Sequence, residues 1–319
     1  MECQDIKVSI ICNTYNHEKY IKDALDGFLM QKTNFSYEVL IHDDASTDGT
    51  ADIIREYENK FPDIIKPIYQ KINQYSQNID ITFAYQLSRA KGKYIALCEG
   101  DDYWTDSLKL QKQFDLMEKH PEIDICTHCA TMIKASHGKK IGTLSPADKF
   151  MIFSVDSVIK GGGGFVATNS IFYRKQLNNK VPDFRLFYSF DYTLQIHGSI
   201  RGGMLYLPDN MSVYRSFVPG SWSQRMNNTE LIEKHLKKLQ QMFLLLDEET
   251  HYEYTDIIKD KISEAGFYAL EKIRKYDDLK SRELEEWYEK QSIKFKIKFN
   301  IKRYCPFLVQ IYRIIKWKI

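Results

Sequence analysis

The chain has 319 residues, 43% of them hydrophobic and 28% charged, which is enough for one large domain with a hydrophobic core and a smaller appendage. Its formal net charge is only +2, which argues against a protein that binds nucleic acid over its whole surface. The charge is uneven, because residues 291–319 hold eight Lys or Arg and no Asp or Glu, leaving a net charge of about −6 on the rest.

The sequence also bears on where the protein works. Its six cysteines are scattered, without the spacing of a small disulfide-stabilised domain. The first residues have no basic segment followed by an apolar run, so we predict no signal peptide. No stretch approaches the roughly 18 apolar residues that span a bilayer. We therefore expect the body of the protein to be soluble, reduced and cytoplasmic.

The first 130 residues alternate between strand-like and helix-like segments. Strands are predicted at residues 6–12, 37–42, 64–69 and 94–98, and helices at 17–31, from 46 onward and at 79–90. This alternation predicts the α/β class, with a mainly parallel, Rossmann-like sheet flanked by helices.

The second half is more helical. A strand at 165–173, a helix at 189–199 and a strand at 204–207 precede helices at 231–246, 257–273 and 281–290. We therefore predict a nucleotide-binding and catalytic domain over residues 1–227, a helical extension over 228–290 and a basic amphipathic tail over 291–319.

Polar clusters follow three of the predicted strands. They are residues 13–16 (Asn-Thr-Tyr-Asn), the pair Asp43 and Asp44, and residues 99–102 (Glu-Gly-Asp-Asp). Ligands of open parallel sheets bind beyond the carboxyl ends of the strands, so we expect these clusters to form a single site.

The third cluster has the composition of a metal site. Glu99, Asp101 and Asp102 place three carboxylates within four residues after an apolar strand. Mg²⁺ and Mn²⁺ prefer such oxygen ligands. Taken alone, the cluster could equally be an acidic loop.

A second possible metal motif, Cys126-Thr127-His128-Cys129, lacks a partner pair and lies on an apolar segment. For this segment we predict buried thiols rather than a zinc site.

Three ordered segments, 8–16, 43–50 and 99–104, together resemble the family 2 glycosyltransferases of GT-A fold, of the bacterial surface-glycan type. The resemblance covers roughly residues 6–225. It implies a GT-A domain that takes a sugar from a nucleoside-diphosphate donor with the help of Mn²⁺ or Mg²⁺. The helical remainder lies outside it.

The resemblance also implies site residues. Tyr15 would stack on the nucleoside base, Asp43 or Asp44 would accept a hydrogen bond from it, and Glu99 would contact the ribose or a metal-bound water. The implied nucleotide-binding set is Thr14, Tyr15, Asn16, Asp43, Asp44, Glu99 and Arg215. Asp101 and Asp102 would hold the metal. The sequence departs from the commoner pattern at Glu99, where the family usually has Asp.

Two further residues have competing interpretations. Asp191 is similar to the family's general base, which removes the acceptor proton in an inverting transfer. Alternatively, it is an acidic residue favoured by the helix N-terminus. The Arg215 guanidinium could bind the diphosphate, or it could close a loop through a salt bridge.

The C-terminal tail interleaves its eight cationic residues with large apolar side chains. This composition suits the surface of an anionic membrane. A helix packed on the catalytic domain, or a tail that binds a partner or nucleic acid, are the alternatives.

We therefore predict an inverting, metal-dependent glycosyltransferase, peripheral on the inner face of the cell membrane, that takes a sugar from a nucleotide-sugar donor. Its acceptor would be a glycan or lipid-linked glycan in cell-surface polysaccharide synthesis, and no nucleic-acid partner is expected. A nucleotidyltransferase is one alternative, although residues 13–16 lack the Gly-rich phosphate loop of that class. The other is a non-catalytic nucleotide-sugar-binding scaffold at the membrane, for which Glu99 leaves room.

Overall fold

The computed structural model of the chain describes residues 5–188, 191–226, 228–305 and 307. Its internal contacts divide it into two compact units, Met1–Arg225 and Met226–Ile319. Each unit is described below by itself.

One sheet organises the described part of the first unit, in the order β3-β2-β1-β4-β9-β6-β10-β5, with β7 beside β6 and β8 beside β10. The strands are β1 (Ile6–Thr14), β2 (Ser36–Asp43), β3 (Ile65–Tyr69), β4 (Tyr94–Leu97), β5 (Tyr103–Trp104), β6 (Ile125–Lys134), β7 (Lys140–Leu144), β8 (Met151–Phe153), β9 (Phe172–Arg174) and β10 (Met204–Ser216).

The α/β class is confirmed, and the sheet is mixed. The first four strands are mutually parallel, as the alternation predicts. Strand β9 then joins β4 and β6 in antiparallel orientation, while β6 and β10 are parallel to each other. The strand predicted at 165–173 is reduced to β9, because the 3-10 turn η3 (Thr168–Ser170) precedes it.

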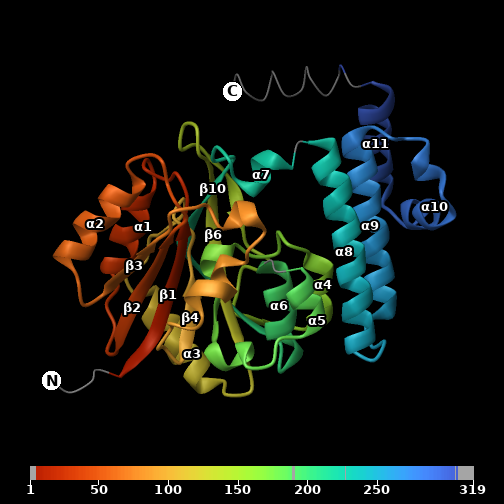
Figure 1. Cartoon of the computed structure of the whole chain (residues 1–319). Coiled ribbons are helices and arrows are strands. Elements are labelled where there is room, and N and C mark those ends of the chain that lie inside the picture. The colour runs from red at the N-terminus through yellow and green to blue at the C-terminus, as the bar shows by residue number, and fades with distance from the viewer. Residues whose placement is uncertain (1–4, 189–190, 227, 306, 308–319) are drawn as a thin grey trace. The chain divides into compact units, whose positions relative to one another are not determined.

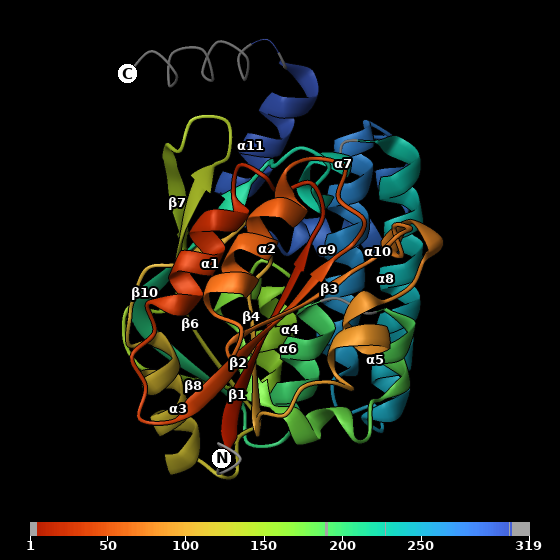
Figure 2. The same ribbon diagram turned by 60° about the vertical axis from the view of Figure 1, so that its left-hand side comes forward.

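Helices cover both sides of this sheet, with α1 and α2 on one side of β1–β4 and α4, α5 and α6 on the other (Figures 1 and 2). The helices of this unit are α1 (Ile21–Leu29), α2 (Thr50–Lys60), α3 (Lys109–Lys119), α4 (Val155–Gly161), α5 (Asp183–Phe187), α6 (Asp191–Ile200) and α7 (Trp222–Arg225).

Helix α1 forms because its apolar residues recur at helical spacing. Ile21, Ala24, Leu25 and Phe28 are fully buried and face the sheet. The helix predicted at 79–90 contains instead a single π-helical turn, Thr82–Gln86. The side chain of Gln86 there donates a hydrogen bond to the Leu40 carbonyl oxygen of β2.

The second unit is helical, as the sequence predicts. It contains α8 (Thr229–Glu249), α9 (Thr255–Ile273), α10 (Arg282–Glu289) and α11 (Ile293–Tyr304). A core of Phe267, Leu279, Trp287 and Phe299 joins the last three helices. Phe299 belongs to the predicted tail, whose residues 306 and 308–319 lie outside the described part of the chain.

Two further findings concern predicted segments. None of the helices in the described residues combines the length and hydropathy needed to cross a membrane. Cys126 and Cys129 are buried free thiols on β6, which confirms that prediction.

Candidate active site

The carboxyl ends of β1, β2 and β4 bring the three predicted polar clusters together. Thr14 and Asp43 are direct partners in the β1–β2 register. The backbone N–H of Asp44 donates to the Thr14 carbonyl oxygen at 2.9 Å, and that of Gly100 donates to the Asn13 carbonyl oxygen at 3.0 Å. The clusters are therefore fixed to one another by backbone hydrogen bonds.

The two neighbouring aspartates of the second cluster have different surroundings, although both are 2% exposed. Both carboxylate oxygens of Asp44 are engaged, accepting from the backbone N–H groups of Gln74 and Tyr75 at 2.7 and 3.0 Å. In Asp43, Oδ2 accepts a long bond of 3.4 Å from the Ser46 N–H. Its Oδ1 is buried and has no hydrogen-bond partner among the described residues.

The structure therefore distinguishes a loop-holding carboxylate, Asp44, from a carboxylate with an open acceptor, Asp43. Burial raises the pKa of Asp43. Of the two residues that the sequence left open, Asp43 is the one whose oxygen could accept a hydrogen bond from a nucleoside base.

The first cluster combines an exposed ring with side chains that tie loops together. The ring of Tyr15 is 43% exposed, as a stacking surface must be. Asn16 has a left-handed backbone (φ 55°), and its side-chain oxygen accepts from the Thr47 N–H at 2.7 Å. Thr14 is buried, and its hydroxyl has no partner in the described part of the chain.

The third cluster, residues 99–102, is called the acidic loop below. It lies directly against the first cluster. A Cβ at Gly100 would lie 2.6 Å from the Thr14 hydroxyl oxygen and 3.0 Å from His17 Nδ1, so only glycine fits there. Burial, reinforced by the charges of Asp101 and Asp191, raises the pKa of Glu99 to about 8. The carboxyl groups of the third cluster and of Asp191 therefore share one electrostatic environment.

Asp101 and Asp102 have different roles in this loop. Asp102 is 2% exposed, and its two oxygens accept from the Arg215 backbone N–H at 2.7 Å and from Asn169 Nδ2 at 3.1 Å. Burial raises its pKa. The Asp101 carboxylate has an imidazole beside it, with His17 Nε2 at 3.9 Å. Asp102 thus fastens the loop to β10, and Asp101 is the more available of the two.

Arg215 adopts the salt-bridge arrangement that the sequence left as an alternative. Its guanidinium pairs with Asp23 of α1 and donates to the Asp101 carbonyl oxygen at 2.8 Å. It also lies over the ring of Tyr103, 4.4 Å from the centroid. A diphosphate contact by Arg215 stays a prediction.

Asp191 is the first residue of α6, as predicted. Its Oδ2 accepts a hydrogen bond of 2.5 Å from the Thr168 hydroxyl. Burial raises the pKa of Asp191, and the Thr168 hydroxyl opposes this by stabilising the carboxylate.

Sequence reasoning missed four side chains of this region: His17, Asp23, Thr168 and Asn169. His17 directly follows the first cluster, so its position offered a signal. The other three carry no motif. They come near the carboxylates only through the packing of α1 and η3.

The acidic side chains of this site are possible ligands of a divalent cation. Among the described residues, no three His, Cys, Asp or Glu side chains are arranged to hold a metal by themselves. Mg²⁺ is commonly bound by one or two carboxylates together with substrate phosphates. A half-buried Glu99 beside two other acidic residues is electrostatically suited to added positive charge. The residues present therefore fit a cation shared with a diphosphate.

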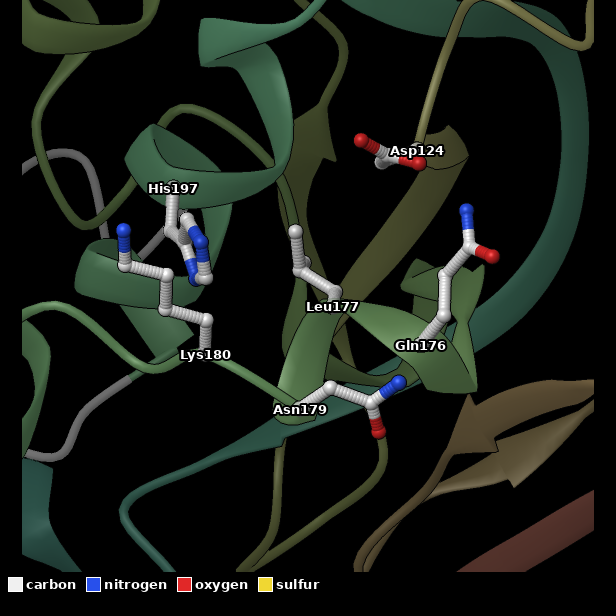
Figure 3. A pocket seen from close by; sticks show the side chains of 6 residues that line it. All are labelled: Asp124, Gln176, Leu177, Asn179, Lys180 and His197. Carbon is white, nitrogen blue, oxygen red and sulfur yellow. The ribbon is translucent and has the colours of Figure 1, made fainter.

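A separate polar pocket of about 330 Å³ lies away from these carboxylates, lined by Asp124, Gln176, Leu177, Asn179, Lys180 and His197 (Figure 3). Asp124 directly precedes β6. Both β4 and β6 are antiparallel to β9, so they run in the same direction, and Asp124 lies at the opposite end from the carboxyl end of β4. The pocket is therefore at the opposite edge of the sheet. Asp124 is held there by Arg201, with Oδ2 accepting from Nε at 2.8 Å.

A family model supplies the assignment. The model described as glycosyl transferase family 2 matches residues 9–194, more than half of the chain. The chain belongs to glycosyltransferase family 2. This family membership supports glycosyl transfer over the nucleotidyl transfer that the sequence left as an alternative.

Among its relatives in sequence is an uncharacterized protein of Mycobacterium tuberculosis (strain ATCC 25618 / H37Rv), 40% identical over 221 residues. The match covers 67% of this chain and 60% of the relative, so the chain spans about 60% of that protein's length. A Bacillus subtilis (strain 168) protein, TuaG, provisionally described as a teichuronic acid biosynthesis glycosyltransferase, is 37% identical over 110 residues, 34% of this chain and 41% of its own.

Solved structures confirm the GT-A fold. S. aureus TarS 1–349 in complex with UDP has a TM-score of 0.56 at 18% identity, covering 92% of this chain and 78% of its own. The mannosyltransferase PcManGT from Pyrobaculum calidifontis, in complex with GDP-Man and Mn²⁺, has a TM-score of 0.51 at 15% identity, covering 97% and 86%.

Proposed function

We propose that this glycosyltransferase is an inverting, metal-dependent enzyme that moves a sugar from a nucleoside-diphosphate donor to a glycan or lipid-linked glycan acceptor in cell-surface polysaccharide synthesis. The observation that carries the proposal is the convergence of three polar clusters and Asp191 at one edge of the sheet. Support for the surface-glycan role comes from the name of the Bacillus relative.

The nucleoside end of the donor is assigned to the first two clusters. The exposed ring of Tyr15 offers a stacking surface. The buried Oδ1 of Asp43, which has no partner within residues that the structure describes, would accept an N–H of the base, which compensates the cost of leaving that oxygen unsatisfied. Uracil and guanine both present such an N–H, so UDP- and GDP-linked sugars are the donors to test first.

The diphosphate end is assigned to the acidic loop. Asp101 would hold Mn²⁺ or Mg²⁺, with Glu99 directly or through water and Asp102 keeping the loop in place. A bound divalent cation would neutralise charge that develops on the departing diphosphate. The Arg215 guanidinium lies at the Asp101 carbonyl oxygen and adds fixed positive charge to the same region.

Asp191 is assigned as the general base. In an inverting transfer the acceptor hydroxyl attacks from the face opposite the leaving group and must lose a proton. The hydrogen bond from the Thr168 hydroxyl to Oδ2 would orient the carboxylate that receives that proton. Burial raises the pKa of this carboxyl, which makes it a stronger base than a solvated aspartate.

The membrane proposal rests on α11. Its apolar residues Ile293, Ile297 and Ile301 are 77%, 56% and 40% exposed and recur every fourth residue, so they lie on one face. Lys294 and Lys298 are exposed beside them. Phe299, counted in the sequence as part of the apolar surface, is buried in the helical core. We therefore place the enzyme on the inner face of the cell membrane, with the isoleucines toward anionic lipid.

The test is a donor screen on the purified chain. Release of nucleoside diphosphate is followed over a panel of UDP- and GDP-sugars, with Mn²⁺, with Mg²⁺ and with chelator. We expect slow hydrolysis of one donor that requires the cation and is lost in Asp101→Ala. Calorimetry with the same nucleotides is run in parallel. If no nucleotide bound with or without the cation, the assignment of the site would be wrong.

A further inference from the structure

A short buried turn, η3 (Thr168–Ser170), lies between the acidic loop and the start of α6. It packs against β4, β6 and β10, and Asn169 and Ser170 have no exposed surface. The Ser170 carbonyl oxygen accepts from the Gln113 side chain at 2.9 Å. The position of this turn is therefore set by the core of the sheet.

The Asn169 side chain uses its hydrogen-bonding groups to fasten the acidic loop. Its Nδ2 donates to Asp102 Oδ2 at 3.1 Å and to the Val213 carbonyl oxygen at 2.9 Å. Its Oδ1 accepts from the Ser212 hydroxyl at 2.7 Å. Only a primary amide supplies two donors and an acceptor in this geometry. Asn169 thus joins the loop that carries Asp101 to strand β10.

The backbone of Asn169 reinforces the same connection. Its carbonyl oxygen accepts from the indole N–H of Trp104 at 2.9 Å. Trp104 is 2% exposed and ends the motif that begins at Glu99. The acidic loop is therefore held to η3 on both sides of Tyr103.

The neighbouring residue acts on the other carboxylate of the site. The Thr168 hydroxyl donates to Asp191 Oδ2 at 2.5 Å, a short bond of the charge-assisted kind. This bond restricts the rotation of the carboxylate. Burial, together with the charge of Asp191, raises the pKa of Glu99, Tyr188 and Tyr214, so these groups interact electrostatically with Asp191.

We propose that η3 is the positioning element of the active site, with Thr168 orienting the general base Asp191 and Asn169 holding the acidic loop through Asp102. Two adjacent residues of one buried turn thereby set the spacing between the base and the diphosphate-binding loop. The inference rests on the proposed function in its assignment of Asp191 as the base. The hydrogen bond between Thr168 and Asp191 does not depend on that assignment.

The decisive experiment is a ¹³C NMR titration of the Asp191 carboxyl in the full chain, labelled at aspartate Cγ, with the signal assigned by its loss in Asp191→Asn. Removing a donor from a carboxylate disfavours its charged form, so Thr168→Val should raise the pKa of Asp191 by about one unit. Thr168→Ser, which keeps the hydroxyl, should restore it. An unchanged pKa in Thr168→Val, with an unchanged melting temperature, would overturn the proposal.

A kinetic experiment on the donor found by the screen gives a second readout. We expect Thr168→Val to lower kcat roughly tenfold, to leave the donor KM unchanged and to move the acid limb of the pH–rate profile to higher pH, with Thr168→Ser like the native chain. A loss of kcat that Thr168→Ser does not restore would show a merely structural role and would count against the proposal.

Asp191→Asn separates this inference from the proposed function. If Asp191→Asn retained native turnover, the base assignment would fail, whatever the Thr168 variants did. If Asp191→Asn were inactive while Thr168→Val titrated and turned over like the native chain, only the role of η3 would fail.

Discussion

Two adjacent aspartates illustrate how the environment of a residue decides its role. Asp43 and Asp44 are equally buried, yet Asp44 is engaged by the Gln74 and Tyr75 backbone N–H groups and Asp43 retains an unpartnered oxygen within the described chain. Burying an acceptor without a partner is costly. This cost is tolerable where a ligand supplies the missing donor.

We predict that removing the Asp43 carboxylate affects nucleotide binding, whereas removing the Asp44 carboxylate affects stability. Asp43→Ala should weaken the binding of UDP or GDP by roughly tenfold to a hundredfold, the value of a hydrogen bond to a charged group, and leave the melting temperature nearly unchanged. Asp44→Ala should lower the melting temperature, because two backbone N–H groups lose their acceptor, at about 1–3 kcal/mol each. Calorimetry and thermal unfolding measure both. Native affinity in Asp43→Ala would contradict the assignment.

The Asp191 carboxyl leads to a prediction about pH. Burial raises its pKa above the usual value of about 3.9 for aspartate. If Asp191 is the proposed base, it acts in its charged form, so kcat/KM should fall as pH decreases through this raised pKa, at a higher pH than for a solvated aspartate. Asp191→Asn should lose about 10²–10⁴ in turnover while binding donor normally. Asp148→Asn, at an exposed aspartate of the same unit, is the matched control.

At the scale of elements, α3 begins with a buried cation. Lys109 has no exposed surface, its Nζ donates to Gln113 Oε1 at 2.7 Å, and it lies 4.0 Å from the centre of the Trp104 ring. Burial lowers its pKa from 10.5 to about 7. Helix α3 thus places an amine that can lose its proton near neutral pH behind the acidic loop.

This lysine predicts a rise of stability with pH. Above pH 7 folded Lys109 loses its proton, while in the unfolded chain the proton stays bound until about pH 10.5. The unfolded state then holds more protons, so the free energy of unfolding increases with pH, by up to about 1.4 kcal/mol per unit. Urea unfolding at pH 7, 8 and 9 should show this slope reduced in Lys109→Met. The buried thiols contribute equally to the pH dependence of both proteins. Equal slopes of unfolding free energy against pH in the two proteins would therefore refute the prediction.

Some helices, strands and contacts could be predicted from the sequence, and others could not. The parallel strands, α1 and the strand-end clusters are visible in sequence, because side-chain periodicity and motif order are local properties. The pairing of Arg215 with Asp23 joins residues far apart in the chain. The capture of Asp102 by Asn169 depends on a turn inside a segment that reads as one strand. No local pattern encodes either contact.

At the scale of the whole molecule, the exposed residues of the second unit lead to a prediction about membrane binding. We expect the full chain to sediment with vesicles that contain anionic lipid and not with neutral ones. The triple variant Ile293→Ser/Ile297→Ser/Ile301→Ser should lose this binding and keep donor hydrolysis, since these residues lie in the other compact unit. Substituting Leu244, which is 55% exposed on α8, by Ser is the control for lost apolar surface. Equal sedimentation with neutral vesicles would contradict the role of charge.

The contact at Gly100 has a consequence for which donors the enzyme accepts. Since the loop passes so close to Thr14 and His17, the parts of the site that we propose bind the base and the diphosphate should not move relative to each other. The distance between the two parts would then determine how long a donor must be to occupy both. We therefore expect sugars linked through a single phosphate to be too short to occupy both parts at once, whatever base they carry.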